Sequence, residues 1–290
     1  MVSAAGYGRV MASGEVPVGA GRTAVGMAWV RAEEGRRPDR LFDDPYARAF
    51  VTAAAGALPD RRDRSGERAG LGAVMSAQGV IRTRFFDDYL LGACSAGCRQ
   101  VVLLAAGLDT RAFRLTWPAG VRMFELDLPE VFAFKDRVLA GQDAAPGCQR
   151  IVLPTDLRVD WPAALVGAGF RLADRTAWLA EGLLVYLSFA EAARLVAAVG
   201  DLSAPDSRIS FEHSPGGTTS LLAQASTMPT LGQFTASWNG GLGEQAPAWL
   251  TRHGWQVQTH DRTVLAAAYG RPVTGPSDGG FITAIRRACP

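Results

Sequence analysis

The sequence predicts an α/β fold with a doubly wound, mostly parallel sheet, and two observations lead to it. From residue 100 onward, short and nearly continuous apolar runs alternate with helical segments. Strands of this kind are buried on both faces, as in parallel sheets that carry helices on either side. The first run, 101–105, leads into a turn of small residues at Gly107, and the second, 121–126, is followed by Asp127. A buried strand, a tight turn and a helix in this order are typical of the ligand-binding edge of such a sheet.

The other elements follow from the same periodicities. Before residue 100 the pattern is helical, and Thr23 and Asp43 suit helix N-caps while Pro45 suits a first turn. Helices are expected at 23–34, from 43 onward, and at 71–94, 130–139, 162–168, 189–199 and 262–269. Strands are expected at 101–105, 121–126, 149–153, 177–180, 208–212, 255–259 and 281–286. The last two strands lie close together in the chain, which suits an antiparallel edge. Residues 1–20 suit a loose arm, and 58–72 a solvated loop or, as an alternative, a mobile lid.

The composition of the chain limits the classes of protein to which it can belong. The chain has 290 residues, 48% of them hydrophobic, which is enough for one large domain with a substantial core. A net charge of +2 is too balanced to indicate a nucleic-acid partner. No apolar run is long enough to span a bilayer and no secretory signal is recognisable, so we expect a cytoplasmic protein without a membrane partner. Cys94, Cys98, Cys148 and Cys289 have no histidine close by in sequence, which favours reduced thiols over a metal site.

Polar residues follow the predicted strands where each of them ends. They are Gly107 and Asp109, then Asp127, Asp156, Glu181 and His213. Ligands of doubly wound sheets bind outside these carboxyl ends, and an acid after the second strand is placed to accept hydrogen bonds from ribose hydroxyls. Asp156 can accept from an adenine amino group while the N–H of the following residue donates to a ring nitrogen. The pattern predicts a ligand that contains a nucleoside, and the missing G-x-G-x-x-G spacing argues against a dinucleotide.

Each of these residues also has a purely structural interpretation. Asp109 and Asp127 equally suit helix N-caps, Asp156 suits a turn, and His213 suits a polar loop. Upstream, the sequence Arg82-Thr83-Arg84 lies on an apolar helix before the first strand. One of the two arginines can clamp an amino-acid carboxylate, and the other is then a surface charge.

Taken together, these segments resemble a known family. Residues 101–115, 124–131, 156–157 and 180–187 are similar to the leucine carboxyl methyltransferase-like family, and more closely to its actinomycete branch of S-adenosylmethionine-dependent methyltransferases. The likeness extends to 43–47, 82–87 and 249–255. It implies a class I methyltransferase fold, a Rossmann-like sheet with an N-terminal helical cap. The expected division is an arm and cap at 1–97 and a catalytic domain at 98–290, with a substrate-covering segment at about 214–250.

The resemblance also implies roles for particular residues. Gly107 lies against the methionine part of S-adenosylmethionine, and Ala105 replaces the first glycine of the usual Gly-x-Gly turn. Asp127 holds the ribose, Asp156 and Leu157 hold the adenine, and Glu181 lines the cofactor pocket. Arg84 is the expected ligand of the cofactor carboxylate, with Arg82 as the alternative and Arg31 as a further basic residue.

The implied activity is O-methylation of a carboxylate or hydroxyl on a small-molecule or peptide natural product, as in secondary metabolism. Methyl transfer from a sulfonium is an in-line displacement, so alignment and charge neutralisation dominate the catalysis. A carboxylate is already ionised and needs only donors such as Tyr186 or an arginine, whereas a hydroxyl needs a base, for which His213 is the candidate. Aromatic residues in 214–250 favour a flat or apolar acceptor. The alternatives are a non-catalytic cofactor-binding protein and a nucleotide-dependent oxidoreductase.

Overall fold

The fold was analysed in a computed structural model, which describes residues 20–55, 66–214, 238–271 and 279–288. The predicted N-terminal arm, most of the arginine-rich loop at 58–72, Cys289 and residues 215–237 of the expected covering segment lie outside these ranges. Within them, no helix is both long and apolar enough to cross a membrane.

A seven-stranded sheet with the order β3-β2-β1-β4-β5-β7-β6 forms the centre of the molecule. Its strands are β1 Gln100–Leu104, β2 Arg122–Asp127, β3 Gln149–Pro154, β4 Thr176–Ala180, β5 Arg208–His213, β6 Trp255–Asp261 and β7 Gly280–Arg286. The first five pair in parallel, and β7 is antiparallel to both β5 and β6. This confirms the predicted doubly wound sheet with antiparallel pairing at one edge. The strand order reverses between β1 and β4, which is where such sheets bind ligands.

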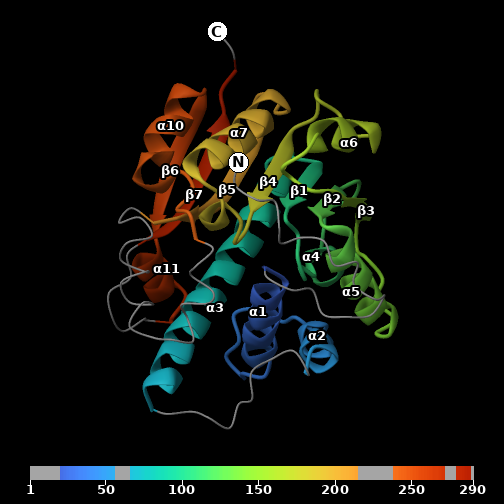
Figure 1. The fold of residues 1–290 in the computed structure, drawn as a ribbon, viewed down its shortest axis with the longest axis vertical. Coiled ribbons are helices and arrows are strands. Elements are labelled where there is room, and N and C mark those ends of the chain that lie inside the picture. The colour runs from blue at the N-terminus through green and yellow to red at the C-terminus, as the bar shows by residue number, and fades with distance from the viewer. Residues whose placement is uncertain (1–19, 56–65, 215–237, 272–278, 289–290) are drawn as a thin grey trace, which may run out of the picture.

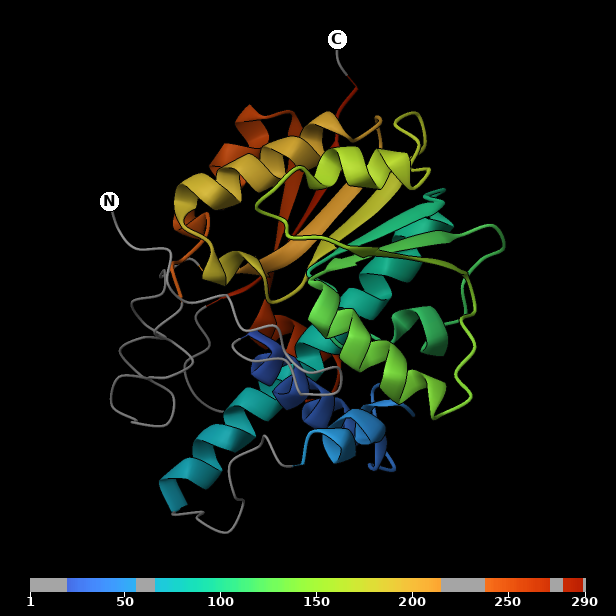
Figure 2. The ribbon, with the colours of Figure 1, turned by 45° about the vertical axis from the view of Figure 1, so that its right-hand side comes forward.

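Helices cover both faces of the sheet, as Figures 1 and 2 show. One face carries α6 Trp161–Gly167, α7 Phe189–Asp201 and α10 Ala246–Arg252, and the other carries α3 Gly66–Ser95, α4 Arg111–Arg114, α5 Pro129–Ala140 and α11 Arg262–Ala268. The short turns η1 Leu184–Tyr186 and η2 Gly243–Gln245 are 3-10 helices. The long α3 crosses the second face diagonally and extends beyond it towards α1 Ala20–Gly35 and α2 Ala47–Ala53.

Local sequence explains where several helices begin. Ser188 and Glu191 form a reciprocal capping box at the start of α7, which satisfies two of the backbone N–H groups that a helix leaves free. Asp160 and Asp261 cap α6 and α11 in the simpler way, by accepting from a backbone N–H in the first turn. Asp261 thereby fixes the start of α11 directly after β6, a placement that matters for the site.

Alternation along the strands separates two hydrophobic cores. In β4, Trp178 and Ala180 face α6, α7 and α10, whereas Ala177 and Leu179 face α3. Because successive side chains point to opposite faces, Glu181 after β4 is directed to the α3 side. The alternation of side chains along β4 therefore places the Glu181 carboxylate next to α3, the helix that carries Arg82 and Arg84.

The N-terminal helices are tied to the turn after β1 by a buried polar cluster. Arg31 of α1 donates from Nε to Asp44 at 2.7 Å and from Nη2 to the carbonyl of Leu108 at 2.7 Å. Thr110 donates from its hydroxyl to the same Asp44 carboxylate at 2.8 Å. Arg31 is thus engaged in holding α1 against the first turn.

Candidate functional site

The turn after β1 is joined directly to the end of β2. Asp127 accepts hydrogen bonds from the N–H of Gly107 at 2.6 Å and from the N–H of Leu128 at 2.7 Å. Gly107 has φ 50, a left-handed conformation that glycine adopts without strain. A Cβ at Gly107 would meet the Ala24 Cβ at an ordinary 3.5 Å, so the backbone conformation and not the space requires glycine. The predicted partnership of Gly107 and Asp127 is present in the fold.

Burial raises the pKa of Asp127, and the two N–H groups that it accepts from oppose this shift. Each carboxylate oxygen receives one of these bonds and keeps a further lone pair for another donor. Lys135, the only lysine of the chain, lies fully buried behind this site on Glu125 at 2.8 Å, and its charge also favours the ionised form of Asp127. The geometry fits a carboxylate that accepts hydrogen bonds from a pair of ribose hydroxyls.

A buried arginine organises the acids beside this turn. Arg111 is 2% exposed and pairs with Asp87 at 2.6 Å, with Glu181 at 2.8 Å and with Asp109. Burial alone would raise the pKa values of Asp109 and Glu181, but Arg111 acts together with Lys135 and Arg114 on Asp109, and with Arg82 on Glu181, and these cations hold both pKa values below their ordinary values. Asp109 also accepts from the N–H of Arg111 at 2.7 Å, but the N-cap of α4 is Thr110, so Asp109 is not the helix N-cap of the structural interpretation.

Arg82 of α3 lies between two carboxylates at the carboxyl edge of the sheet. Its Nε is 2.9 Å from Glu181, and its Nη1 donates to Glu212 at 3.1 Å. The Nε contact lacks hydrogen-bond geometry, so this buried atom has no hydrogen-bond partner. Burial would lower the pKa of Arg82, but Glu181 and Glu212 outweigh it and raise that pKa, so the guanidinium stays charged. The Arg82 side chain is 20% exposed, so this partly buried cation is suited to receive a ligand carboxylate.

The two arginines of α3 have different surroundings. Arg84 pairs with Asp88 at 2.9 Å, donates to the carbonyl of Leu41 at 2.9 Å and lies over the Tyr269 ring. Residues two apart on a helix point in nearly opposite directions, because each adds about 100° of rotation. Arg84 therefore faces away from Glu181, whereas Arg82, the alternative from the sequence, lies beside it.

Glu212 belongs to the site although the sequence did not single it out. It accepts from the N–H of Gly182 at 2.9 Å as well as from Arg82, and burial raises its pKa. The signal that could have found it is an acid next to the buried Phe211 near the carboxyl end of strand β5, where an unpaired carboxylate is costly.

Asp156 and Leu157 follow β3 as predicted, at the far side of the same edge. Asp156 accepts from the Arg158 side chain at 2.9 Å and from the Arg158 N–H at 2.9 Å, and these hydrogen bonds lower its pKa. Leu157 packs partly buried against the core under α6 and α7. An adenine bound here would share Asp156 with Arg158.

The two residues that were expected to act on the acceptor lie after β4 and at the end of β5. The Tyr186 hydroxyl is hydrogen-bonded to Thr23 of α1 at 3.2 Å, which joins the N-terminal helices to this edge. His213 is 9% exposed and, by strand alternation, lies on the opposite face from Glu212. Burial lowers the pKa of His213, so its imidazole is neutral at neutral pH.

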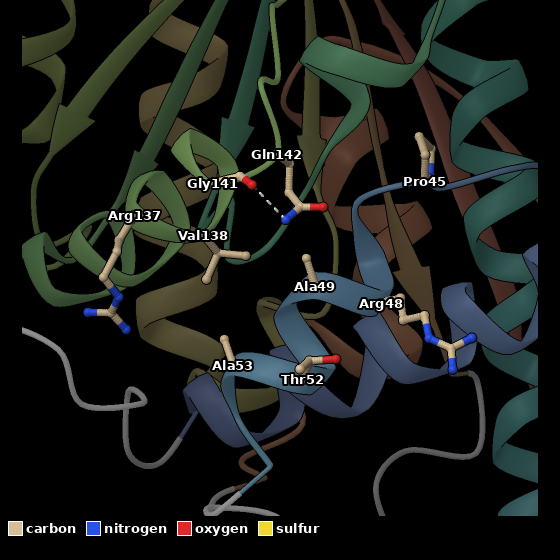
Figure 3. Close-up of a pocket in the computed structure, with 9 residues that line it drawn as sticks. All are labelled: Pro45, Arg48, Ala49, Thr52, Ala53, Arg137, Val138, Gly141 and Gln142. Carbon is tan, nitrogen blue, oxygen red and sulfur yellow. Dashed lines mark hydrogen bonds between the residues drawn. The ribbon is translucent and has the colours of Figure 1, made fainter.

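A separate groove of about 590 Å³ lies on the surface between α2 and α5 (Figure 3). Its lining includes Arg48 and Arg137, which point away from each other on opposite sides, and the Gln142 amide donates to the Gly141 carbonyl at 3.0 Å. None of the predicted site residues lines it. Since its polar groups do not converge, we place the candidate site at the sheet edge instead.

The cysteines and acids show no sign of a metal centre in the described part of the chain. Cys94, Cys98 and Cys148 are free, and burial raises the pKa of Cys94 to about 12 and that of Cys148 to about 11. Thiols with such pKa values stay protonated and unreactive at neutral pH. Among the described residues, no group of three or more His, Cys, Asp or Glu is arranged to hold a metal ion.

Ala105 adopts φ 56, a conformation that costs an L-residue roughly 1–2 kcal/mol. We therefore expect Ala105→Gly to raise the free energy of unfolding in urea by about 1 kcal/mol, because glycine removes this strain. Ala106, which lacks a positive φ, is the matched control, and Ala106→Gly should lower the free energy of unfolding. Equal destabilisation by both changes would contradict the strain at Ala105.

With this geometry described, comparison with known proteins identifies the family. The family model for leucine carboxyl methyltransferases matches residues 24–200. A protein from Frankia alni, named as a proposed S-adenosyl-L-methionine-dependent methyltransferase, is 54% identical over 274 residues, which cover 94% of this chain and 96% of the relative. A protein of the same description from Streptomyces coelicolor is 43% identical and covers 93% of this chain and 97% of its own.

Solved structures agree on the fold. A protein of the DUF574 family from Streptomyces avermitilis superposes with a TM-score of 0.56 at 14% identity, covering 92% of this chain and 97% of its own. A structure described as a proposed methyltransferase from Thermobifida fusca has a TM-score of 0.52 at 17% identity, covering 89% and 94%. The resemblance stated from the sequence is confirmed: the chain belongs to the leucine carboxyl methyltransferase family, a family of S-adenosylmethionine-dependent methyltransferases.

Proposed function

We propose that this methyltransferase transfers the methyl group to an oxygen, on a carboxylate or hydroxyl of a small-molecule or peptide natural product. The observation that carries the proposal is Arg82, a partly buried cation at the carboxyl edge of the sheet whose partner Glu181 also pairs with Arg111 after the Gly107 turn. The printed family name, leucine carboxyl methyltransferase, favours a carboxylate acceptor.

The residues of this edge fit S-adenosylmethionine in a definite orientation. Arg82 would bind the carboxylate of its methionine part, and the turn from Ala105 to Gly107 would lie alongside that part. Asp127 would hold the ribose hydroxyls, and Asp156 with Leu157 the adenine, as the resemblance implies. Glu181 would line the pocket while it keeps Arg82 and Arg111 in place.

Bound S-adenosylmethionine supplies a methyl group on a positively charged sulfur. The task of the chain is then to align the acceptor oxygen and to exclude water. A carboxylate acceptor arrives ionised, so Tyr186 would only orient it by donating a hydrogen bond. A hydroxyl acceptor would lose its proton to a base, and His213 is neutral at neutral pH and able to take it.

The acceptor class is tested by the chemistry of the product. We expect the labelled methyl group from S-adenosylmethionine to be released as methanol when the product is treated with mild base, because esters hydrolyse and ethers do not. A base-stable product would contradict the carboxylate and support the hydroxyl. Absence of turnover with both acceptor classes, while S-adenosylhomocysteine binds, would favour a non-catalytic cofactor-binding protein.

His213→Ala gives an independent measure of the same question. With a carboxylate acceptor we expect the variant to retain most of its kcat, because no proton is removed. With a hydroxyl acceptor, the loss should be roughly a hundredfold or more. In that case kcat of the wild type should fall with decreasing pH below the ordinary imidazole pKa of about 6.5, since burial lowers the pKa of His213.

A further inference from the structure

One buried arginine at the carboxyl edge forms no ion pair with any described residue. Arg262 begins α11 directly after β6, and β6 runs parallel to β5 because both are antiparallel to β7. Arg262 therefore lies at the same edge of the sheet as Glu181 and Glu212. It is 8% exposed, and its Nε is buried without a hydrogen-bond partner. Within the described ranges, no carboxylate or carbonyl is hydrogen-bonded to its guanidinium.

The other buried arginines show that this is unusual for the molecule. Arg31 pairs with Asp44 at 2.7 Å, and Arg111 pairs with three acids. Arg262 has instead the ring of Phe281, whose centroid lies 5.5 Å from its guanidinium carbon. An aromatic face attracts a cation but accepts none of the N–H bonds that lie in the guanidinium plane. The planar donor fork of Arg262 is left for a partner that the described residues do not supply.

The charged groups around Arg262 limit which anionic group can be its partner. Glu212, Arg82 and Asp261 are its charged neighbours, and none of them is close enough to form an ion pair with it. Glu212 is already engaged by Arg82 and by the N–H of Gly182. The same acids would repel a doubly charged group such as a phosphate, whereas a singly charged carboxylate matches both the charge and the fork of one arginine.

We propose that Arg262 binds the carboxylate of the methyl acceptor and is the residue that determines specificity for a carboxylic acid. The proposal rests on the proposed function and names a specificity-determining residue for the same site. A buried and unpaired charge destabilises the free protein. Such a loss of stability in the free protein is common at functional sites, where a bound ligand supplies the missing partner.

The stability of the free protein gives the first test. Arg262→Met should raise Tm by roughly 2–4 °C without any ligand, because it removes a buried, unpaired charge and keeps the apolar stem. Arg31→Met is the matched control and should lower Tm, since it leaves the buried Asp44 carboxylate without its ion-pair partner. A fall in Tm for Arg262→Met as large as that for Arg31→Met would show that the guanidinium is structural and would overturn the proposal.

Binding of a defined carboxylate gives the second test. We would titrate 3-phenylpropanoate and its neutral amide, at constant ionic strength, into protein saturated with S-adenosylhomocysteine and follow both by ligand-detected NMR. The phenyl group suits the expected flat, apolar acceptor. The wild type should bind the acid at least tenfold more tightly than the amide, and Arg262→Met should lose this preference. Arg84→Met, which removes an arginine paired with Asp88, should keep it.

Two outcomes of this titration would overturn the proposal: a wild type that does not discriminate the acid from the amide, or a preference that survives in Arg262→Met. Binding of S-adenosylhomocysteine is measured in the same samples before the titration. Its failure would count against the proposed function and not against the carboxylate site, so the two can be told apart.

Discussion

Arg111→Met should lower the free energy of unfolding by about 3–5 kcal/mol, the cost of removing one partner from a buried ion-pair cluster. Arg111 is 2% exposed and pairs with Asp87, Asp109 and Glu181. Methionine fills a similar volume but leaves three acids close together without their shared cation. Unfolding in urea, followed by circular dichroism, measures the loss.

The loss should also depend on pH. In the wild type the pKa values of Asp109 and Glu181 are below their ordinary values, so these acids stabilise the fold above the unfolded pKa values of about 4. This contribution disappears as the pH falls through their folded pKa values. The difference between wild type and Arg111→Met should therefore be largest near neutral pH and shrink below about pH 4.

Arg175→Met is the control, because Arg175 forms a surface pair with Asp206 at 2.8 Å in which both side chains are about half exposed. Pairs of this kind contribute about 0–1 kcal/mol. If Arg111→Met were no more destabilising than Arg175→Met, the buried cluster would not hold the site together as described.

Arg82→Met should weaken binding of S-adenosylhomocysteine by about tenfold to a hundredfold, which corresponds to a charge-assisted hydrogen bond of about 1.5–3 kcal/mol. Arg82 is the arginine of α3 that lies beside Glu181, and its side chain is 20% exposed. Isothermal titration calorimetry on folded protein gives the affinity, and Arg82→Lys should restore part of it by returning the charge without the fork.

The matched control is Arg84→Met, two residues along the same helix. Arg84 is paired with Asp88 and the Leu41 carbonyl, so its loss should leave the affinity within about twofold of the wild type. A large loss of affinity in Arg84→Met with none in Arg82→Met would restore the original assignment from the sequence.

Local pattern and one rule of topology were enough to predict the sheet and the proximity of Gly107 and Asp127 at its carboxyl edge. Gly107 and Asp127 each follow a buried strand, and adjacent parallel strands must bring their carboxyl ends together. The fold contains this pair as a direct hydrogen bond of 2.6 Å. Both residues could be located because their neighbours in sequence determine the strand ends that place them.

The rest of the site depends on contacts between distant parts of the chain. Arg82 and Arg84 carry the same chemistry two residues apart, and only the packing of α3 on the sheet decides which of them meets Glu181. The partner of Arg82 in β5, Glu212, is 130 residues away. Arg262 resembles any charged residue at a helix start until its burial is known. The helical and strand periodicities of the sequence do not reveal these contacts between distant residues.

A crystal structure of the complex with S-adenosylhomocysteine tests the central claim most directly. The account predicts the amino-acid carboxylate of the ligand on Arg82, its ribose hydroxyls on Asp127 and its adenine between Asp156 and Leu157. A ligand whose carboxylate lies on Arg84, or whose ribose has no contact with Asp127, would contradict the site described at the carboxyl edge of the sheet.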